Sequence, residues 1–173
     1  MRTNAIRLAW TPVALLLVGA AAVAQQPSAP LPTDAVKTFA SSAEVAALAV
    51  KAKNERKEGQ ALVIERILQL APYNANLEYR AAVGPAAVHE KEAEMFYVID
   101  GAGTLVTGGT LANLKRTNAE NLSGTAIEGG TPRSVAKGDF MIVPENTPHW
   151  FSAINGTLVL MSIHVPRPAP AAR

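Results

Sequence analysis

The sequence predicts an all-β domain, a barrel or sandwich of short strands, with one short helix in front of it. Eight or so short runs of β-branched and apolar residues, separated by turn residues, follow one another between residues 60 and 166. Helical spacing of apolar residues occurs before them, over residues 42–56. Of the 173 residues 49% are apolar and only 17% are charged, so the chain can bury the core of one ordinary domain.

The first 24 residues are typical of a cleaved secretory signal peptide. Arg2 and Arg7 precede an apolar run over residues 8–23, and Ala22-Val23-Ala24 offers a small-x-small cleavage site before Gln25. The run is short for a membrane span, and an uncleaved anchor is the alternative. We therefore expect a bacterial periplasmic or secreted protein with no stable membrane anchor after cleavage. The sequence has no cysteine, so it is compatible with an oxidising compartment but gives no evidence for one.

Charge gives no indication of nucleic-acid binding. The chain has 16 basic and 14 acidic residues, and cleavage would remove two of the basic ones, Arg2 and Arg7. The mature protein would then be close to neutral, and it has no basic stripe or aromatic-interleaved basic patch.

Residues 25–59 are expected to form a linker and then the helix. Residues 25–33 are rich in Gln, Pro, Ser and Ala, a composition typical of linkers. Ser41 stands three residues ahead of Glu44, which is the signature of a capping box. The following apolar residues predict a helix over residues 42–56 that ends near Gly59. Its apolar stripe needs cover, either from the neighbouring sheet or from a partner subunit.

The barrel is expected over residues 60–166, and a Pro-rich tail over residues 167–173. Turn chemistry at residues 71–74 separates the first two strands. The glycine-dotted segment 108–131 is expected to be a loop with a short hairpin, or a flexible lid. The strands are predicted at residues 62–70, 77–83, 95–99, 104–107, 133–136, 140–143, 149–154 and 158–165.

One stretch, residues 87–101, combines a buried strand with a carboxylate. Residues 95–99 form a five-residue apolar run that ends at an Asp-Gly turn, and Glu94 stands at its start. An ionised carboxylate entering a buried strand is costly unless something compensates it. A metal ion shared with His89 is one such compensation. The alternatives are a surface ion pair for Glu94 and an ordinary loop position for His89.

A second stretch, residues 138–150, delivers another histidine to a strand. A Gly-Asp turn leads into the buried strand 140–143, and the rigid bend 144–148 then leads to His149. Asn146 stands where a left-handed backbone is expected, which Asn tolerates better than other residues except Gly. Alternatively, His149 is a core residue that is hydrogen-bonded to the backbone.

Together these two stretches resemble the two motifs of the cupins, small β-barrels also called double-stranded β-helices. The first cupin motif is usually written His-x-His, three or four residues, Glu, six residues, Gly, and the second Gly, five residues, Pro-x-Gly, two residues, His. The resemblance covers about residues 60–165. The positions that match are His89, Glu94 and Gly101 for the first motif, and Gly138, Pro144, Asn146 and His149 for the second.

The resemblance implies a cupin-type double-stranded β-helix, or jelly-roll barrel, that binds a divalent metal ion. His89, Glu94 and His149 would be the metal ligands, and this set suits iron, manganese or zinc. Ala87 stands where the first histidine of the usual pair would be, so one of four customary ligands is missing and weak or absent metal binding is an alternative. Cupins commonly pair, so the resemblance also implies a homodimer, formed through the exposed face of the central strand and the helix.

Alternation along the strands suggests which residues line a pocket for a small-molecule substrate or ligand. Phe96 and Val98 share a face with Glu94 and would form an apolar wall. Either Tyr79 or Arg80 must point inward; an inward arginine would suit an anionic substrate, and the alternative for it is a surface ion pair. The last strand carries one more candidate, His164, which either lines the pocket or is structural. No catalytic acid or base is identified.

Three functions remain open from the sequence. The first is a periplasmic, metal-dependent enzyme that acts on a small oxygen-bearing molecule by dioxygenase, isomerase or lyase chemistry, among which the fold does not choose. The second is a non-catalytic cupin that binds a small molecule with weak or no metal. The third is a structural dimer. The sequence does not decide whether the protein is an enzyme.

Overall fold

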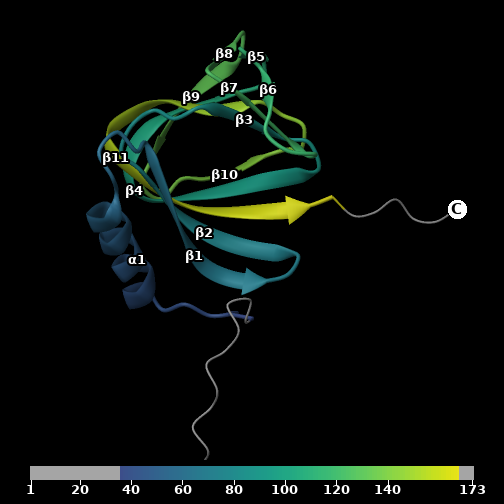
Figure 1. Cartoon of the computed structure of the whole chain (residues 1–173). Coiled ribbons are helices and arrows are strands. Elements are labelled where there is room, and N and C mark those ends of the chain that lie inside the picture. The colour runs from purple at the N-terminus through teal and green to yellow at the C-terminus, as the bar shows by residue number, and fades with distance from the viewer. Residues whose placement is uncertain (1–35, 168–173) are drawn as a thin grey trace, which may run out of the picture. The chain divides into compact units, whose positions relative to one another are not determined.

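The computed structural model describes residues 36–167, and the predicted signal peptide, the linker 25–33 and the tail after residue 167 lie outside the described residues. Within them the fold is mostly β with one N-terminal helix, which confirms the predicted class. Figure 1 shows the helix and the strands, whose bounds are α1 (Ser42–Glu55), β1 (Leu62–Leu70), β2 (Tyr73–Arg80), β3 (Ala86–His89), β4 (Glu92–Thr107), β5 (Thr110–Ala112), β6 (Lys115–Arg116), β7 (Asn121–Gly124), β8 (Ala126–Glu128), β9 (Thr131–Ala136), β10 (Phe140–Val143) and β11 (His149–Pro166).

Two long strands, β4 and β11, organise the sheet. They pair antiparallel along almost their whole length, from Glu92 opposite Pro166 to Thr107 opposite His149. The first half of β4 pairs with β10 and its second half pairs with β9. Similarly, β11 pairs with β3 through its first residue and with β2 through its second half. Both strands therefore contribute to two layers, which curl around a common interior in Figure 1.

Each of these long strands corresponds to two strands in the sequence-based prediction. The predicted strands 95–99 and 104–107 are joined in β4, because Gly101 bends the strand with a φ of 85° and does not end it. No side chain fits at the second glycine of the bend, where a Cβ on Gly103 would lie 2.6 Å from the carbonyl oxygen of Ala153. The predicted strands 149–154 and 158–165 are likewise joined in β11, whose register shifts between Ile154 and Leu158.

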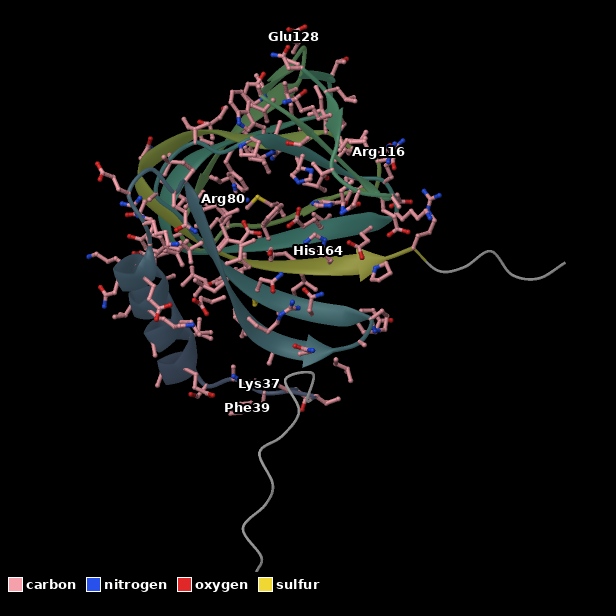
Figure 2. All side chains as sticks on the ribbon, in the orientation of Figure 1. Lys37, Phe39, Arg80, Arg116, Glu128 and His164 are labelled. Atoms are coloured by element: carbon pink, nitrogen blue, oxygen red, sulfur yellow. The ribbon has the colours of Figure 1, made fainter. Side chains whose placement is uncertain are left out.

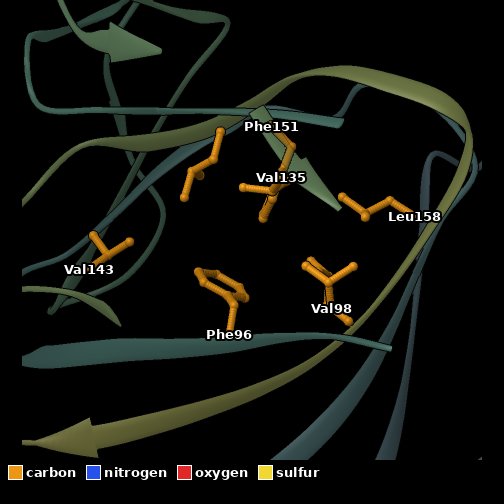
Figure 3. Close-up of a cluster of buried hydrophobic side chains, with 8 residues drawn as sticks. Phe96, Val98, Val135, Val143, Phe151 and Leu158 are labelled. Carbon is orange, nitrogen blue, oxygen red and sulfur yellow. The ribbon is translucent and has the colours of Figure 1, made fainter. Parts of the chain in front are cut away.

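The main core lies between the two layers. Phe96, Val98, Leu158 and Leu160 are fully buried, and burial of each such side chain stabilises the fold by about 1.5–3 kcal/mol. Figure 3 shows this cluster of eight side chains, which come from β4, β9, β10 and β11: Phe96, Val98, Leu105, Val135, Val143, Phe151, Leu158 and Leu160.

A second core lies between α1 and the outer face of β1, β2 and β11. Ala52 of the helix and Leu77 of β2 are both fully buried there, so the sheet covers the apolar stripe of the helix. The predicted capping box is present: Ser41 Oγ accepts a hydrogen bond from Glu44 N at 3.2 Å, and Glu44 Oε2 accepts one from Ser41 N at 2.7 Å. No helix among residues 36–167 is both long enough and apolar enough to span a membrane.

The glycine-dotted segment 108–131 is folded onto the domain. The consecutive strands β6 and β7 pair with each other, as the hairpin alternative expects, and β5 pairs with β8. All four residues of β7 also pair with β3, from Asn121 opposite His89 to Gly124 opposite Ala86. This pairing attaches the segment to the strand that carries His89.

Candidate metal centre

Three histidines surround one buried carboxylate inside the barrel. His89 ends β3, Glu94 is the third residue of β4, and β11 contributes His149 at its start and His164 near its end. His149 and Glu94 are 6% and 4% exposed. Asn146 has the expected left-handed backbone, with a φ of 55°, and its N–H donates a 2.7 Å hydrogen bond to the carbonyl oxygen of His89. That bond ties the two motif segments together.

The Nε2 atom of each imidazole faces the carboxylate of Glu94. Glu94 Oε2 lies 3.0 Å from His149 Nε2 and 3.3 Å from His89 Nε2. The other carboxylate oxygen, Oε1, lies 3.3 Å from His164 Nε2. The ring centroids of His89 and His164 are 4.7 Å apart, so the imidazoles themselves are in contact.

The opposite ring nitrogen of every imidazole is held by an oxygen acceptor. An acceptor at Nδ1 favours a proton there, so that the neutral imidazole keeps its lone pair on Nε2, which is how a protein presents histidine to a metal ion. The three contacts are His89 Nδ1 to Asn121 Oδ1 at 2.7 Å, His164 Nδ1 to Glu92 Oε2 at 3.0 Å, and His149 Nδ1 to the carbonyl oxygen of Thr147 at 3.1 Å.

The electrostatics of the cluster favour the charged forms of Glu94 and His89. Burial acts to raise the pKa of Glu94, but hydrogen bonds from His149 and His89 and the charges of His149 and His164 outweigh it and hold that pKa well below its usual range. For His89, burial acts to lower the pKa, and the hydrogen bond and charge of Glu94 outweigh it and raise the pKa of the imidazole. The carboxylate is therefore ionised and available as a ligand at neutral pH.

The donor atoms suit a divalent metal ion. His89, Glu94 and His164 each offer one ligand atom, and these atoms lie within 4.8 Å of one another, so the three residues could hold a metal ion. Imidazole nitrogen and carboxylate oxygen are common ligands of zinc, iron and manganese. The predicted ligand His149 contacts the same carboxylate. Ala87, where the cupin pattern has a further histidine, provides no donor, whereas His164 brings a third imidazole from the last strand.

A cavity of about 210 Å³ opens beside the cluster. Its wall includes Ala87, the three imidazoles and Glu94, and on the side of β1 and β2 it includes Leu62, Ile64, Glu78 and Arg80. Trp150 Nε1 donates a 2.8 Å hydrogen bond to the carbonyl oxygen of Gly84, which holds the remaining part of the wall, Gly84 and Pro85, in place. A larger surface depression of about 410 Å³ on the other side of Gly84 and Pro85 is lined by neither histidine nor carboxylate.

The structure brings together some of the substrate-binding candidates and separates others. Arg80 and His164 line the cavity, and in Figure 2 both lie inside the ring of strands. Tyr79 points to the opposite face of β2 and packs beneath α1. Phe96 and Val98 lie in the main core, where the Phe96 ring centroid is 6.2 Å from that of His149. Contact of any of these five residues with a substrate stays a prediction.

Three polar residues at the site were not predicted from the sequence. Asn121 and Glu92 hold imidazole nitrogens, and Glu78 lines the cavity. Glu92 follows Glu90 and Lys91 in a charged run that reads as a solvated rim, and Asn121 lies in the segment without strand periodicity. Glu78 was detectable, because alternation places it on the same face as Arg80.

The sequence also matches a known family. The family model described as Cupin matches residues 54–171, which is more than half of the chain. The chain belongs to the cupin family. Among proteins with curated functions, none matches this cupin in sequence.

The solved structures that resemble this cupin do so at low sequence identity. HppE in its iron(II) form has a TM-score of 0.48 and 15% identity, and the match covers 63% of this chain and 53% of the HppE chain. This chain therefore spans about half the length of HppE. KdgF from Halomonas sp. has a TM-score of 0.47 and 17% identity over 65% of this chain and 87% of its own. A putative mannose-6-phosphate isomerase from Ralstonia eutropha JMP134 has a TM-score of 0.45 and 12% identity over 64% and 90%. At these values the likeness does not extend to activity or ligand.

Proposed function

We propose that this cupin is a divalent-metal-dependent enzyme that acts on a small oxygen-bearing molecule. One observation carries the proposal: three imidazoles whose Nδ1 atoms are all held by acceptors present Nε2 to one ionised carboxylate at the wall of a cavity. Structural metal sites are closed by protein ligands, whereas a site that faces a cavity has room for a substrate.

His89, Glu94 and His164, together with the predicted ligand His149, would hold the ion. A divalent ion there would act as a Lewis acid that polarises a substrate oxygen. Other residues of the chain would prepare the site. The acceptors at Nδ1 fix the orientation of the imidazoles, and the small side chain of Ala87 leaves space in the cavity wall. Dioxygenase, isomerase and lyase chemistry all remain within this proposal.

Metal analysis of the purified protein tests the proposal. The wild type is expected to retain about one divalent ion per chain after dialysis, and Glu94→Ala is expected to lose it because the substitution removes the ligand that all three imidazoles face. Glu128→Ala is the matched control, since Glu128 is an exposed glutamate on β8, away from the cavity. Equal metal content in the Glu94 and Glu128 variants, or no metal in the wild type after loading, would contradict the proposal.

A second candidate function is a non-catalytic cupin that binds a small molecule with weak or no metal. Two observations favour it: Ala87 occupies the position of a customary ligand, and the ion pairs between Glu94 and the histidines neutralise the buried carboxylate without a metal. The discriminating measurement is ligand binding by chelator-treated protein. Binding that is unchanged by the chelator supports this candidate, and binding that needs added metal supports the enzyme.

Export to the periplasm or the medium is part of the proposal and depends on residues 1–24. Amino-terminal sequencing of protein recovered from the producing bacterium tests it. A mature chain that begins at Gln25 supports cleavage of the predicted signal peptide, and a chain that still contains Arg2 and Arg7 refutes it.

We also propose that the protein is a homodimer. The outer face of β4 and β10 carries three exposed apolar side chains that α1 does not cover, Tyr97, Phe140 and Ile142. Phe140 and Ile142 are 59% and 58% exposed, and the rings of Phe140 and Tyr97 lie side by side with centroids 6.5 Å apart. Exposed apolar patches of this kind mark association surfaces. Analytical ultracentrifugation should give a dimer for the wild type and a monomer for Ile142→Glu; a monomeric wild type would refute the dimer.

A further inference from the structure

The cavity contains a second charged pair that the candidate metal centre does not use. Glu78 and Arg80 point inward from β2, and both Nε and Nη2 of Arg80 donate to the same oxygen of Glu78, Oε2, at 2.9 and 2.6 Å. The Glu78 and Arg80 side chains are only 5% and 13% exposed. The guanidinium carbon of Arg80 lies over the Phe151 ring, 4.6 Å from its centroid, and this cation–π contact helps to fix the orientation of the guanidinium.

A buried ion pair in this place is poorly explained by stability. Removing two charges from water costs several kcal/mol each, and a pair of apolar side chains of similar volume commonly stabilises a fold equally well. Charged groups gathered in a cavity next to a candidate metal centre are instead typical of a binding site.

The pairing leaves one edge of the guanidinium available. Glu78 takes the edge formed by Nε and one N–H of Nη2. The other edge, formed by Nη1 and the second N–H of Nη2, has no hydrogen-bond acceptor among the side chains and backbone of residues 36–167. Two parallel N–H donors on a fixed plane match an acid group with two oxygens.

The charge and size of the cavity restrict the ligand further. The two glutamates and Arg80, together with a divalent ion, would leave one net positive charge in the cavity. A cavity of about 210 Å³ corresponds to roughly seven water molecules, which is room for a small organic acid. A monoanion therefore balances the site, and a dianion does not.

We propose that the ligand is a small carboxylic acid with a second oxygen next to the acid group, such as a 2-hydroxy or 2-keto acid. Its carboxylate binds the free edge of Arg80, and its second oxygen faces the candidate metal centre. Glu78 is the positioning residue that fixes the arginine. This inference rests on the proposed function, because it assumes that the histidine cluster holds the metal ion.

Calorimetric titration of the metal-loaded protein with glycolate, glycolamide and inorganic phosphate tests the inference. Glycolamide has the shape of glycolate without its charge. Glycolate is expected to bind at least about 10-fold more tightly than glycolamide, because a hydrogen bond to a charged group contributes more than one to a neutral group. Tighter binding of phosphate than of glycolate would show a phosphate site and overturn the carboxylate assignment, and the absence of glycolate binding at millimolar concentration would overturn it as well.

Two variants test whether the preference for glycolate depends on Arg80. The double variant Glu78→Gln/Arg80→Gln removes both charges together and replaces the ion pair by two amides, so neither partner is left as an unpaired buried charge. It should bind glycolate roughly 10- to 100-fold more weakly, with unchanged metal content and unchanged affinity for glycolamide. Arg133→Gln, at an exposed arginine of β9, is the control and should match the wild type. Glycolate affinity that is unchanged in the double variant would refute the inference.

Two further measurements separate this inference from the proposed function. If the double variant does not fold, Arg80→Lys keeps the charge but loses the planar fork, so a smaller but measurable loss of glycolate affinity is expected. If the wild type binds no metal, the proposed function fails by itself. Glycolate and glycolamide titrated into the metal-free protein then still measure the preference of Arg80 for the anion, and equal affinities would refute it.

Discussion

The hydrogen bond from His89 to Asn121 is predicted to control metal affinity from outside the ligand set. Asn121 belongs to β7, and its Oδ1 accepts a 2.7 Å hydrogen bond from Nδ1–H of His89. Because β7 pairs with β3, the backbone of Asn121 lies directly opposite that of His89. Asn121→Ala keeps this backbone pairing and removes only the acceptor.

The magnitude follows from the geometry of that bond. A distance of 2.7 Å is at the short end of the N–H···O range, and the side chain is partly buried, so the net contribution is near the upper end of about 0.5–1.5 kcal/mol. If the metal-bound state loses about 1.4 kcal/mol of stabilisation, the metal affinity falls about tenfold. This agrees with the roughly 10- to 100-fold loss of affinity when such outer contacts are removed from metal sites.

The assay is competition for zinc, manganese or iron(II) against a chromophoric chelator, with thermal unfolding as a check on folding. Asn121→Asp retains an acceptor at the same place and should keep at least the affinity of the wild type. Asn54→Ala, at an exposed asparagine of α1, is the surface control. A folded Asn121→Ala variant with the metal affinity of the wild type would refute the reasoning, since His89 would then bind no metal or need no orientation.

Three further predictions concern stability and use denaturant unfolding. Gly101→Ala should destabilise the fold by more than about 3 kcal/mol, because a Cβ at this left-handed position would overlap the carbonyl oxygen of Thr157. Gly156→Ala, at a position that is also left-handed but has open space around it, should destabilise the fold by only about 1–2 kcal/mol. Equal losses of stability in the two variants would contradict the packing argument. Phe96→Ala, at a fully buried ring, should cost about 3–5 kcal/mol, and a cost under about 1 kcal/mol would mean that the core is not packed as described. Ser41→Ala removes the helix cap and should cost about 0.5–2 kcal/mol; an unchanged unfolding midpoint would show that the cap makes no net contribution.

The strands that depend on local signals could be predicted from the sequence. Residues 62–70 and 140–143 coincide with β1 and β10, because apolar and β-branched runs bounded by turn residues specify such strands locally. Gly101 shows the limit of this reasoning. A left-handed glycine serves equally well in a turn and in a strand bend, and here the pairing with residues of β11 more than 50 positions away decides for the bend.

The same limit applies to the candidate metal centre. Alternation along the last strand puts His164 on the inner face, but which inner residue it meets depends on a register that places it opposite Glu94. Asn121 is harder still, since nothing in its own segment shows that it pairs with β3. The two cupin motifs indicated His89, Glu94 and His149 because their spacing is local, whereas the residues that complete the cluster arrive through long-range pairing.

The path of β11 has a consequence for how this chain can change length. His149 and His164 reach the same carboxylate from opposite ends of one strand, so the effect of an added or deleted residue between them depends on where it falls. Around Gly156 the ladder is already irregular, because Ile154 opposes Gly103 and Leu158 opposes Gly101. One extra residue there can be absorbed by the irregular pairing without changing which way either imidazole points. A single insertion between Leu160 and Ile163, where the pairing is regular, would instead turn His164 out of the barrel, so a deep insertion scan should show tolerance at the first place and loss of the site at the second.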